Sequence, residues 1–110
     1  MVDTDEAVTV SDVPARHRFE ILVAGERVGF AAYRDVGGRR VFTHTEIDPA
    51  RGGQGLATRL IRAALDDARD KGFVITPQCS FVADFIRRHP DYGDLVAGTA
   101  GAPGLGGTQP

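Results

Sequence analysis

Cysteine and lysine are almost absent from this chain, and long apolar runs are missing altogether. The single cysteine, Cys79, excludes an internal disulfide bond. No stretch reaches the roughly 18 consecutive apolar residues that a membrane-spanning helix needs. The acidic first residues also lack the apolar run of a signal peptide. We therefore expect a protein of the reducing cytoplasm that has no membrane partner.

A strong excess of charge is missing as well. The formal net charge is −2, and every basic residue other than Lys71 is an arginine. A slightly acidic chain has no bulk attraction for nucleic acid, so we expect no nucleic-acid partner. One cysteine and three scattered histidines do not have the spacing of metal ligands. The sequence thus predicts neither a nucleic-acid interface nor a metal centre.

The length of 110 residues and the hydrophobic content of 42% fit one globular domain. Residues 1–17 are polar and acidic, and although Val8 and Val10 would suit a short strand, we expect a flexible lead-in. Residues 98–110 are rich in glycine, alanine and proline, which predicts a disordered tail. The folded domain is therefore expected over residues 18–97.

The hydrophobic pattern of this domain changes its period once. Alternating apolar residues predict three strands, which cover residues 19–23, 28–33 and 41–47, and short turns between them favour an antiparallel meander. A helical period follows over residues 56–69, and Gly72 suits its end. A buried strand (73–75) and a second helix (81–88), capped by Ser80, complete the order β-β-β-α-β-α. The expected fold class is α/β, a single compact domain with helices on a mixed sheet.

A glycine-rich turn lies between the third strand and the first helix. Gly52, Gly53 and Gly55 allow a tight turn with bare N–H groups, and the helix behind them adds the positive end of its dipole. Arg51 and Gln54 are further donors at the rim. The turn lacks the Gly-Lys-Ser/Thr of a Walker loop and the early G-x-G-x-x-G of a dinucleotide fold. It predicts a phosphate or pyrophosphate site, and the alternative is a plain tight turn without a ligand.

This turn resembles the acetyl-CoA-binding motif of GNAT-type N-acetyltransferases, which reads Gln/Arg-x-x-Gly-x-Gly/Ala. Gly55 and Ala57 match its last two fixed positions, whereas Gly52 stands where Gln or Arg is usual. The resemblance implies acetyl-CoA as cofactor, and it implies that the cofactor is held by the residues of the turn and the helix start: Arg51, Gly52, Gly53, Gln54, Gly55, Leu56 and Ala57.

Four blocks in order are similar to a small, stand-alone "YjdJ-type" GNAT domain: His44-Thr45-Glu46, the glycine turn, residues 77–82 and residues 88–92. This narrower resemblance covers roughly residues 18–96. It implies acetyl transfer to an amine acceptor, which is either a small molecule or a lysine or N-terminus of a protein. Two alternatives are a non-catalytic module that binds acetyl-CoA or CoA, and an interaction domain without a ligand.

Three residues are candidates for the proton chemistry. Cys79 precedes a helix start, which favours a thiolate, so it is either an acid for the leaving thiolate, an acceptor of the acetyl group or a buried apolar residue. His44 and Glu46 are expected to point to the same face of their strand as Phe42. They form either a base, acting through a water molecule, or a solvated polar face.

Tyr92 is a further proton donor in one reading. The other reading is a packed ring with a solvated hydroxyl.

Overall fold

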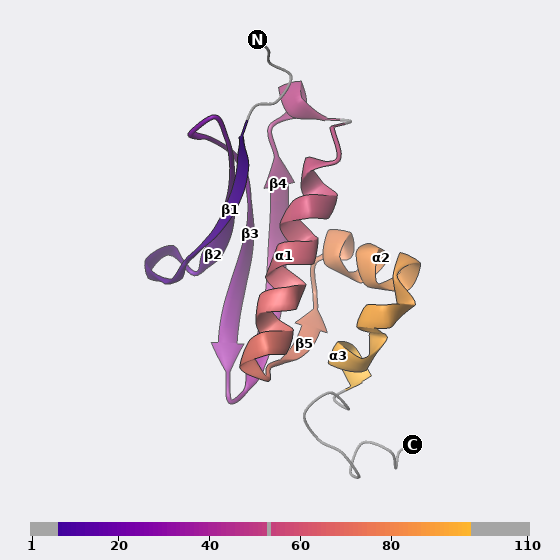
Figure 1. Ribbon diagram of the computed structural model, residues 1–110. Coiled ribbons are helices and arrows are strands. Elements are labelled where there is room, and N and C mark those ends of the chain that lie inside the picture. Colours follow the sequence, from indigo (N-terminus) through magenta and orange to yellow (C-terminus); the bar gives the residue numbers. More distant parts are fainter. Residues whose placement is uncertain (1–6, 53, 98–110) are drawn as a thin grey trace.

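The computed structural model describes residues 7–52 and 54–97 (Figure 1). Five strands and three α-helices form one body in which a single sheet carries the helices. The elements, in chain order, are β1 (Val8–Val13), β2 (Arg18–Val23), β3 (Glu26–Val36), β4 (Arg39–Ile47), α1 (Leu56–Lys71), β5 (Val74–Pro77), α2 (Ser80–Arg88) and α3 (Gly93–Ala97). Three 3-10 turns, Pro14–Arg16, Pro49–Arg51 and Pro90–Tyr92, join them.

The strands lie side by side in the order of the chain, β1-β2-β3-β4-β5. Successive strands from β1 to β4 are antiparallel to one another. Strand β5 runs parallel to β4, because α1 crosses over between them. The predicted α/β class and the mixed sheet are therefore confirmed.

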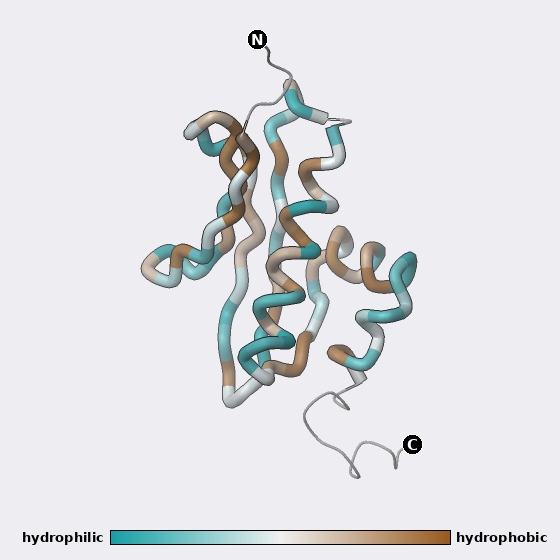
Figure 2. The backbone as a smooth tube through the Cα atoms, viewed as in Figure 1, coloured by the Kyte–Doolittle hydropathy of each residue, from teal (hydrophilic) through white to brown (hydrophobic). Residues whose placement is uncertain are grey.

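The three helices share one hydrophobic core with the sheet. In Figure 1, α1 lies over the sheet and runs roughly along the strands, and α2 and α3 lie beside it. The tube in Figure 2 alternates between apolar and polar positions along α1, because the helix buries one face and exposes the other. Its buried residues follow one another at spacings of one, three and four positions and are Leu56, Leu60, Ile61, Ala64, Leu65 and Ala68. Gly72 ends the helix in the left-handed region, as its position predicted.

The segment expected to be a flexible lead-in is part of the sheet, and that expectation is wrong for the described residues. Val8–Val13 pairs with β2 along its whole length, from Val8↔Val23 to Val13↔Arg18. Val8 and Val10 pack against the core, and Asp12 accepts a 2.6 Å hydrogen bond from the Tyr33 hydroxyl. The short strand is stable because its alternate residues reach the core that the other strands build. The expected tail, residues 98–110, lies outside the described residues.

The expected faces of β4 are also wrong, because its pairing with β3 contains a bulge. Tyr33 pairs with Phe42 and Ala32 with His44, so Thr43 is an extra residue on β4. Phe42 and Thr45 therefore both face the helices, whereas His44 and Glu46 face the other side. One inserted residue reverses the alternation for the rest of the strand.

Two details differ at the second helix. Cys79, not Ser80, occupies the N-cap position of α2, and the cap makes no side-chain hydrogen bond. The chain then continues beyond α2 into α3, which the hydrophobic pattern did not predict. Leu95 on α3 is fully buried, so the short helix closes the core beside β5.

Candidate functional site

The glycine turn forms the start of α1 as the sequence predicted. Asp48 accepts a 3.0 Å hydrogen bond from the Ala50 N–H, and this bond caps the 3-10 turn Pro49–Arg51 that precedes α1. Gly55 is the N-cap of α1 and has a φ of 72°, which a residue with a side chain rarely adopts. The helix has no side-chain cap and no acidic residue in its first turn. Its positive end is thus available to an anion.

A cavity of about 400 Å³ opens beside this helix start. Of the predicted cofactor residues, Arg51, Gly52, Gly55, Leu56 and Ala57 line it. Gln54 does not line it, and Gly53 lies outside the described residues. The remaining lining residues come from the strand end, the helix and the second helix: Ile47, Thr58, Phe81 and Arg88. The cavity therefore lies between the glycine turn and α2.

The end of β4 reaches this cavity with one edge open. Strand β5 pairs with β4 only from Arg39 to Phe42. The chain then leaves the sheet, and the Cys79 N–H donates to the Phe42 carbonyl at 2.9 Å. In the part of the chain that the structure describes, residues 44–47 pair with β3 alone, and the bulged Thr43 pairs with neither neighbour. An open strand edge offers backbone donors and acceptors to a ligand that carries amides.

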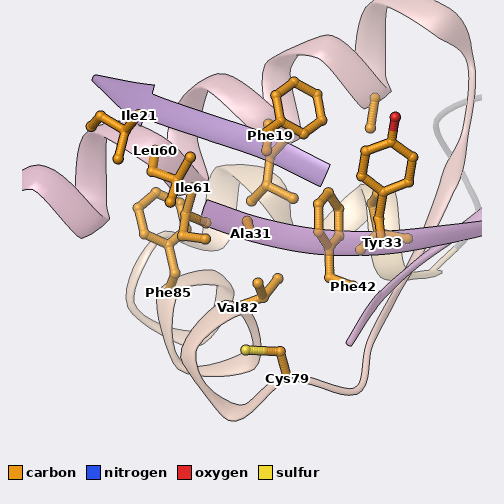
Figure 3. Packing of buried hydrophobic residues seen from close by; sticks show 14 of the residues in the cluster. Phe19, Ile21, Ala31, Tyr33, Phe42, Leu60, Ile61, Cys79, Val82 and Phe85 are labelled. Carbon is orange, nitrogen blue, oxygen red and sulfur yellow. The ribbon is translucent and has the colours of Figure 1, made fainter. Parts of the chain in front are cut away.

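Cys79 lies at the point where the two strands separate. Its side chain points into the core below Val82 (Figure 3), and its residue exposure is 8%. The thiol donates a 3.3 Å hydrogen bond to the Thr45 hydroxyl. Neither residue lines the cavity, but Ile47 and Phe81, each two positions further along the chain, do. The Cys79–Thr45 pair therefore lies close behind the cavity wall.

His44 and Glu46 are brought together on the opposite face of β4. The His44 Nε2 and Glu46 Oε2 atoms are 2.7 Å apart, and both side chains are more than half exposed. The His44 ring lies 5.9 Å from that of Phe30. Glu46 also lines a second hollow of about 190 Å³, which shares Ile47 with the cavity of the glycine turn. Ile47 thus lies between a hollow beside the His44–Glu46 pair and the candidate anion site.

Tyr92 is engaged elsewhere. Its hydroxyl donates a 2.7 Å hydrogen bond to Asp66 on α1, and its ring packs against Phe85. Burial, followed by the hydrogen bond to Asp66, raises the pKa of the Tyr92 phenol. This geometry fits a structural residue that ties the 3-10 turn after α2 to α1.

Three site residues were missed by the sequence analysis. Thr45 is a buried polar residue whose only sequence signal is its place between His44 and Glu46. Phe81 and Arg88 are seven positions apart, and that spacing puts them on one face of a helix. Among residues 7–52 and 54–97, no cluster of three or more potential ligands could hold a metal ion, and no helix is long and apolar enough to span a membrane.

One comparison with known proteins identifies a family, and another identifies a similar fold. Residues 18–95 match the family model of the GCN5-related N-acetyltransferases. The fold is similar to the NMR solution structure of a GCN5-like candidate N-acetyltransferase from Staphylococcus aureus, with a TM-score of 0.61 and 22% identity over 84% of this chain and 89% of that one. At this identity the likeness shows the fold alone. Among curated proteins the chain has no match.

Proposed function

Because this chain belongs to the GCN5-related N-acetyltransferase family, we propose that it transfers an acetyl group from acetyl-CoA to an amine. The observation that carries the proposal is the cavity between the glycine turn and α2, which joins an uncapped helix start to the open edge of β4. A diphosphate fits the helix start, since N–H groups and the helix dipole favour negative charge there. There is space for a ligand beside the Gly52 backbone, because a Cβ added at this position would have only the Pro49 carbonyl oxygen near it, at 3.4 Å.

The open edge of β4 suits the amide groups of the pantetheine arm. Extended amides add to a strand edge through main-chain hydrogen bonds. Residues 43–47 would hold the arm so that the thioester lies where β4 and β5 separate. When bound, acetyl-CoA supplies the activated acyl group, and the chain supplies orientation, which accounts for much of the rate in such reactions.

We propose that the His44–Glu46 pair removes the proton from the amine that accepts the acetyl group. Glu46, or a water molecule that it holds, takes one proton from the amine as the nitrogen bonds to the thioester carbonyl carbon. His44, at 2.7 Å from Glu46, orients the carboxylate and shares the proton. The hollow beside Glu46 is the proposed entry of the acceptor, a small amine or a lysine or N-terminus of a protein.

Cys79 has two proposed roles on the other face of β4. As an acid, it gives its thiol proton to the coenzyme sulfur while the carbon–sulfur bond breaks. As a nucleophile, its sulfur bonds to the carbonyl carbon and its proton passes to the leaving sulfur. The amine nitrogen then bonds to the acetyl carbon, the bond from that carbon to the Cys79 sulfur breaks, and one proton of the amine passes to the sulfur and restores the thiol. Either role requires a reduced thiol, which supports a cytoplasmic location.

A second candidate function is a module that binds acetyl-CoA without turnover. Its support is that Cys79 and the His44–Glu46 pair lie on opposite faces of β4. In this case the cavity and the glycine turn act as described, but no group of the chain completes the proton transfer.

Thermal unfolding with acetyl-CoA tests the shared part of both candidates. A ligand that binds only the native state at 100 times its Kd stabilises that state by about 2.7 kcal/mol, so the Tm should rise with concentration. Gly55→Asp should abolish the rise through charge repulsion and a strained φ. Gly25→Asp is the matched control, because Gly25 also has a positive φ and open space around it but lies in the β2–β3 turn. Equal Tm values with and without millimolar acetyl-CoA would refute the proposal.

A further inference from the structure

The second helix gives two side chains to the cavity of the glycine turn, and neither belongs to the core. Phe81 is 45% exposed, although the other apolar face of α2 buries Val82, Phe85 and Ile86. Arg88 lies two turns further along the same face as Phe81, and its side chain is 69% exposed. Packing against the protein explains neither an aromatic ring nor a guanidinium at the cavity wall.

The charges around Arg88 leave it able to bind an anion. Its Nε atom lies 3.1 Å from one carboxylate oxygen of Asp84. Asp84 also pairs with Arg87, so one negative charge faces two positive ones. A guanidinium has five N–H donors, and a single contact through Nε leaves the terminal donors for a phosphate.

The cavity thus offers two anion sites of different kinds. The start of α1, with Gly55 and the adjoining Arg51, presents backbone N–H groups and a helix dipole. Arg88 faces the cavity from the second helix and presents a planar fork. A ligand that uses both carries two anionic groups on one scaffold, and a flat apolar group suits Phe81; a nucleotide with two phosphate positions meets all three demands.

We propose that Arg88 binds a ribose 3′-phosphate while Phe81 packs against the purine of the same nucleotide. This inference rests on the proposed function and deepens it. A 3′-phosphate is attached to the ribose that also carries the 5′-diphosphate, a few covalent bonds away. Arg88 is then the specificity-determining residue that distinguishes coenzyme A from its 3′-dephospho form.

Calorimetric titration with CoA and with 3′-dephospho-CoA tests this assignment. A hydrogen-bonded charge pair lost from a ligand reduces affinity by about tenfold or more. The wild-type chain should therefore bind CoA at least about tenfold tighter than the dephospho form. Arg88→Gln should reduce this ratio to about one, mainly by weakening CoA binding. Phe81→Ala should weaken both ligands and leave the ratio unchanged.

Arg87→Gln is the matched control, because Arg87 has the same partner and a similar exposure but does not line the cavity. It should keep the wild-type ratio, and the unliganded Tm should be similar in all four proteins. Equal affinities of the wild type for the two ligands, or the same change of the ratio in both arginine variants, would overturn the inference and leave the proposed function standing. Binding of neither ligand by the wild type would overturn both.

Discussion

At the scale of single residues, one hydrogen-bonded pair joins β4 to the start of α2. The Cys79 thiol and the Thr45 hydroxyl are 3.3 Å apart, although 34 positions separate them in the sequence. The hydrogen bond fixes the direction of the thiol at the point where the strands separate. The same bond gives the buried Thr45 hydroxyl a hydrogen-bond partner.

Replacing Cys79 by serine should separate chemistry from binding. Cys79→Ser keeps the size of the side chain but removes its acidity and its nucleophilic sulfur. We expect turnover to fall by at least about 100-fold, as for the loss of an acid–base group, while the affinity for acetyl-CoA hardly changes. Mass spectrometry of the intact wild-type protein distinguishes the two roles, because only a nucleophile leaves a hydroxylamine-sensitive acetyl adduct. Near-full turnover of the serine variant would show that Cys79 only packs.

Tyr33 makes the stability of the fold sensitive to alkaline pH. Burial, followed by the hydrogen bond to Asp12, raises the pKa of the Tyr33 phenol. The folded state therefore favours the protonated phenol, and this stability is complete below the unfolded pKa of about 10 and is lost as the pH rises toward the folded value. The free energy of unfolding should decrease more steeply from about pH 9 to about pH 11 in the wild type than in Tyr33→Phe. Identical slopes would contradict this assignment.

At the scale of secondary-structure elements, the sequence predicted what local patterns determine. The helix period and Gly72 gave α1, and the alternation of apolar residues gave β2, β3 and most of β4. The bulge at Thr43 was invisible, because it depends on how β4 pairs with β3 and not on the residues of β4 alone. Val8 and Val10 suggested strand β1, but a flexible lead-in was preferred, because alternate valines become informative only when a core exists to cover them.

In the candidate site, too, only the features that depend on local sequence were predicted. The glycine turn was predicted because its signal is continuous in the sequence. Thr45 beside Cys79 and the Arg88–Phe81 wall were not, since they depend on how α2 folds back onto β4. The alternation in the sequence also placed His44 and Glu46 on the same face of β4 as Phe42. The bulge at Thr43 puts them on the opposite face.

The packing of β3 against β4 depends on Gly29. A Cβ at this position would lie 2.5 Å from the Ile47 Cδ1 atom and 2.6 Å from the Glu46 carbonyl oxygen. Gly29→Ala should therefore cost about 1–3 kcal/mol of stability, as in overpacked cores, and should disturb the end of β4 that lines the cavity. Denaturant unfolding measures the change.

Gly93→Ala is the matched control for this prediction. Gly93 has helical angles (φ −63°, ψ −29°), and a Cβ there would meet nothing within 4 Å. The substitution should raise stability by about 0.4–1 kcal/mol, because it restricts the unfolded chain. If both alanine variants had the same stability, the close contact at Gly29 would not matter.

At the scale of the whole molecule, a buried arginine ties the sheet to α1. Arg40 is only 3% exposed, its guanidinium lies 4.0 Å from the centre of the Tyr33 ring, and it forms salt bridges with Asp35 and Asp67. Burial would lower the pKa of Arg40, but the hydrogen bonds and charge of Asp35 outweigh it and raise the pKa. The charge is therefore retained and paired within the fold.

Arg40→Met should destabilise the domain toward the lower end of the roughly 3–5 kcal/mol typical of a broken buried ion pair, because the two aspartates are partly solvated. Arg39→Met is the control, since the Arg39 side chain is exposed and, among the described residues, donates to the Thr76 hydroxyl alone, at 2.8 Å. We expect this control to stay within about 0.5 kcal/mol of the wild type. If denaturant unfolding showed equal losses of stability in the two variants, the salt bridges of Arg40 would not be what stabilises the domain.

Acetyl transfer from the cavity of the glycine turn is tested by the release of free CoA thiol from acetyl-CoA in the presence of an amine panel. The panel contains a polyamine, a lysine-bearing peptide, a peptide with a free N-terminus and small amine metabolites. Wild type and Gly25→Asp should both release thiol in proportion to one of these amines, and Gly55→Asp should not. Thiol release that ignores the amine, or that persists unchanged in Gly55→Asp, would contradict acetyl transfer from the cavity of the glycine turn.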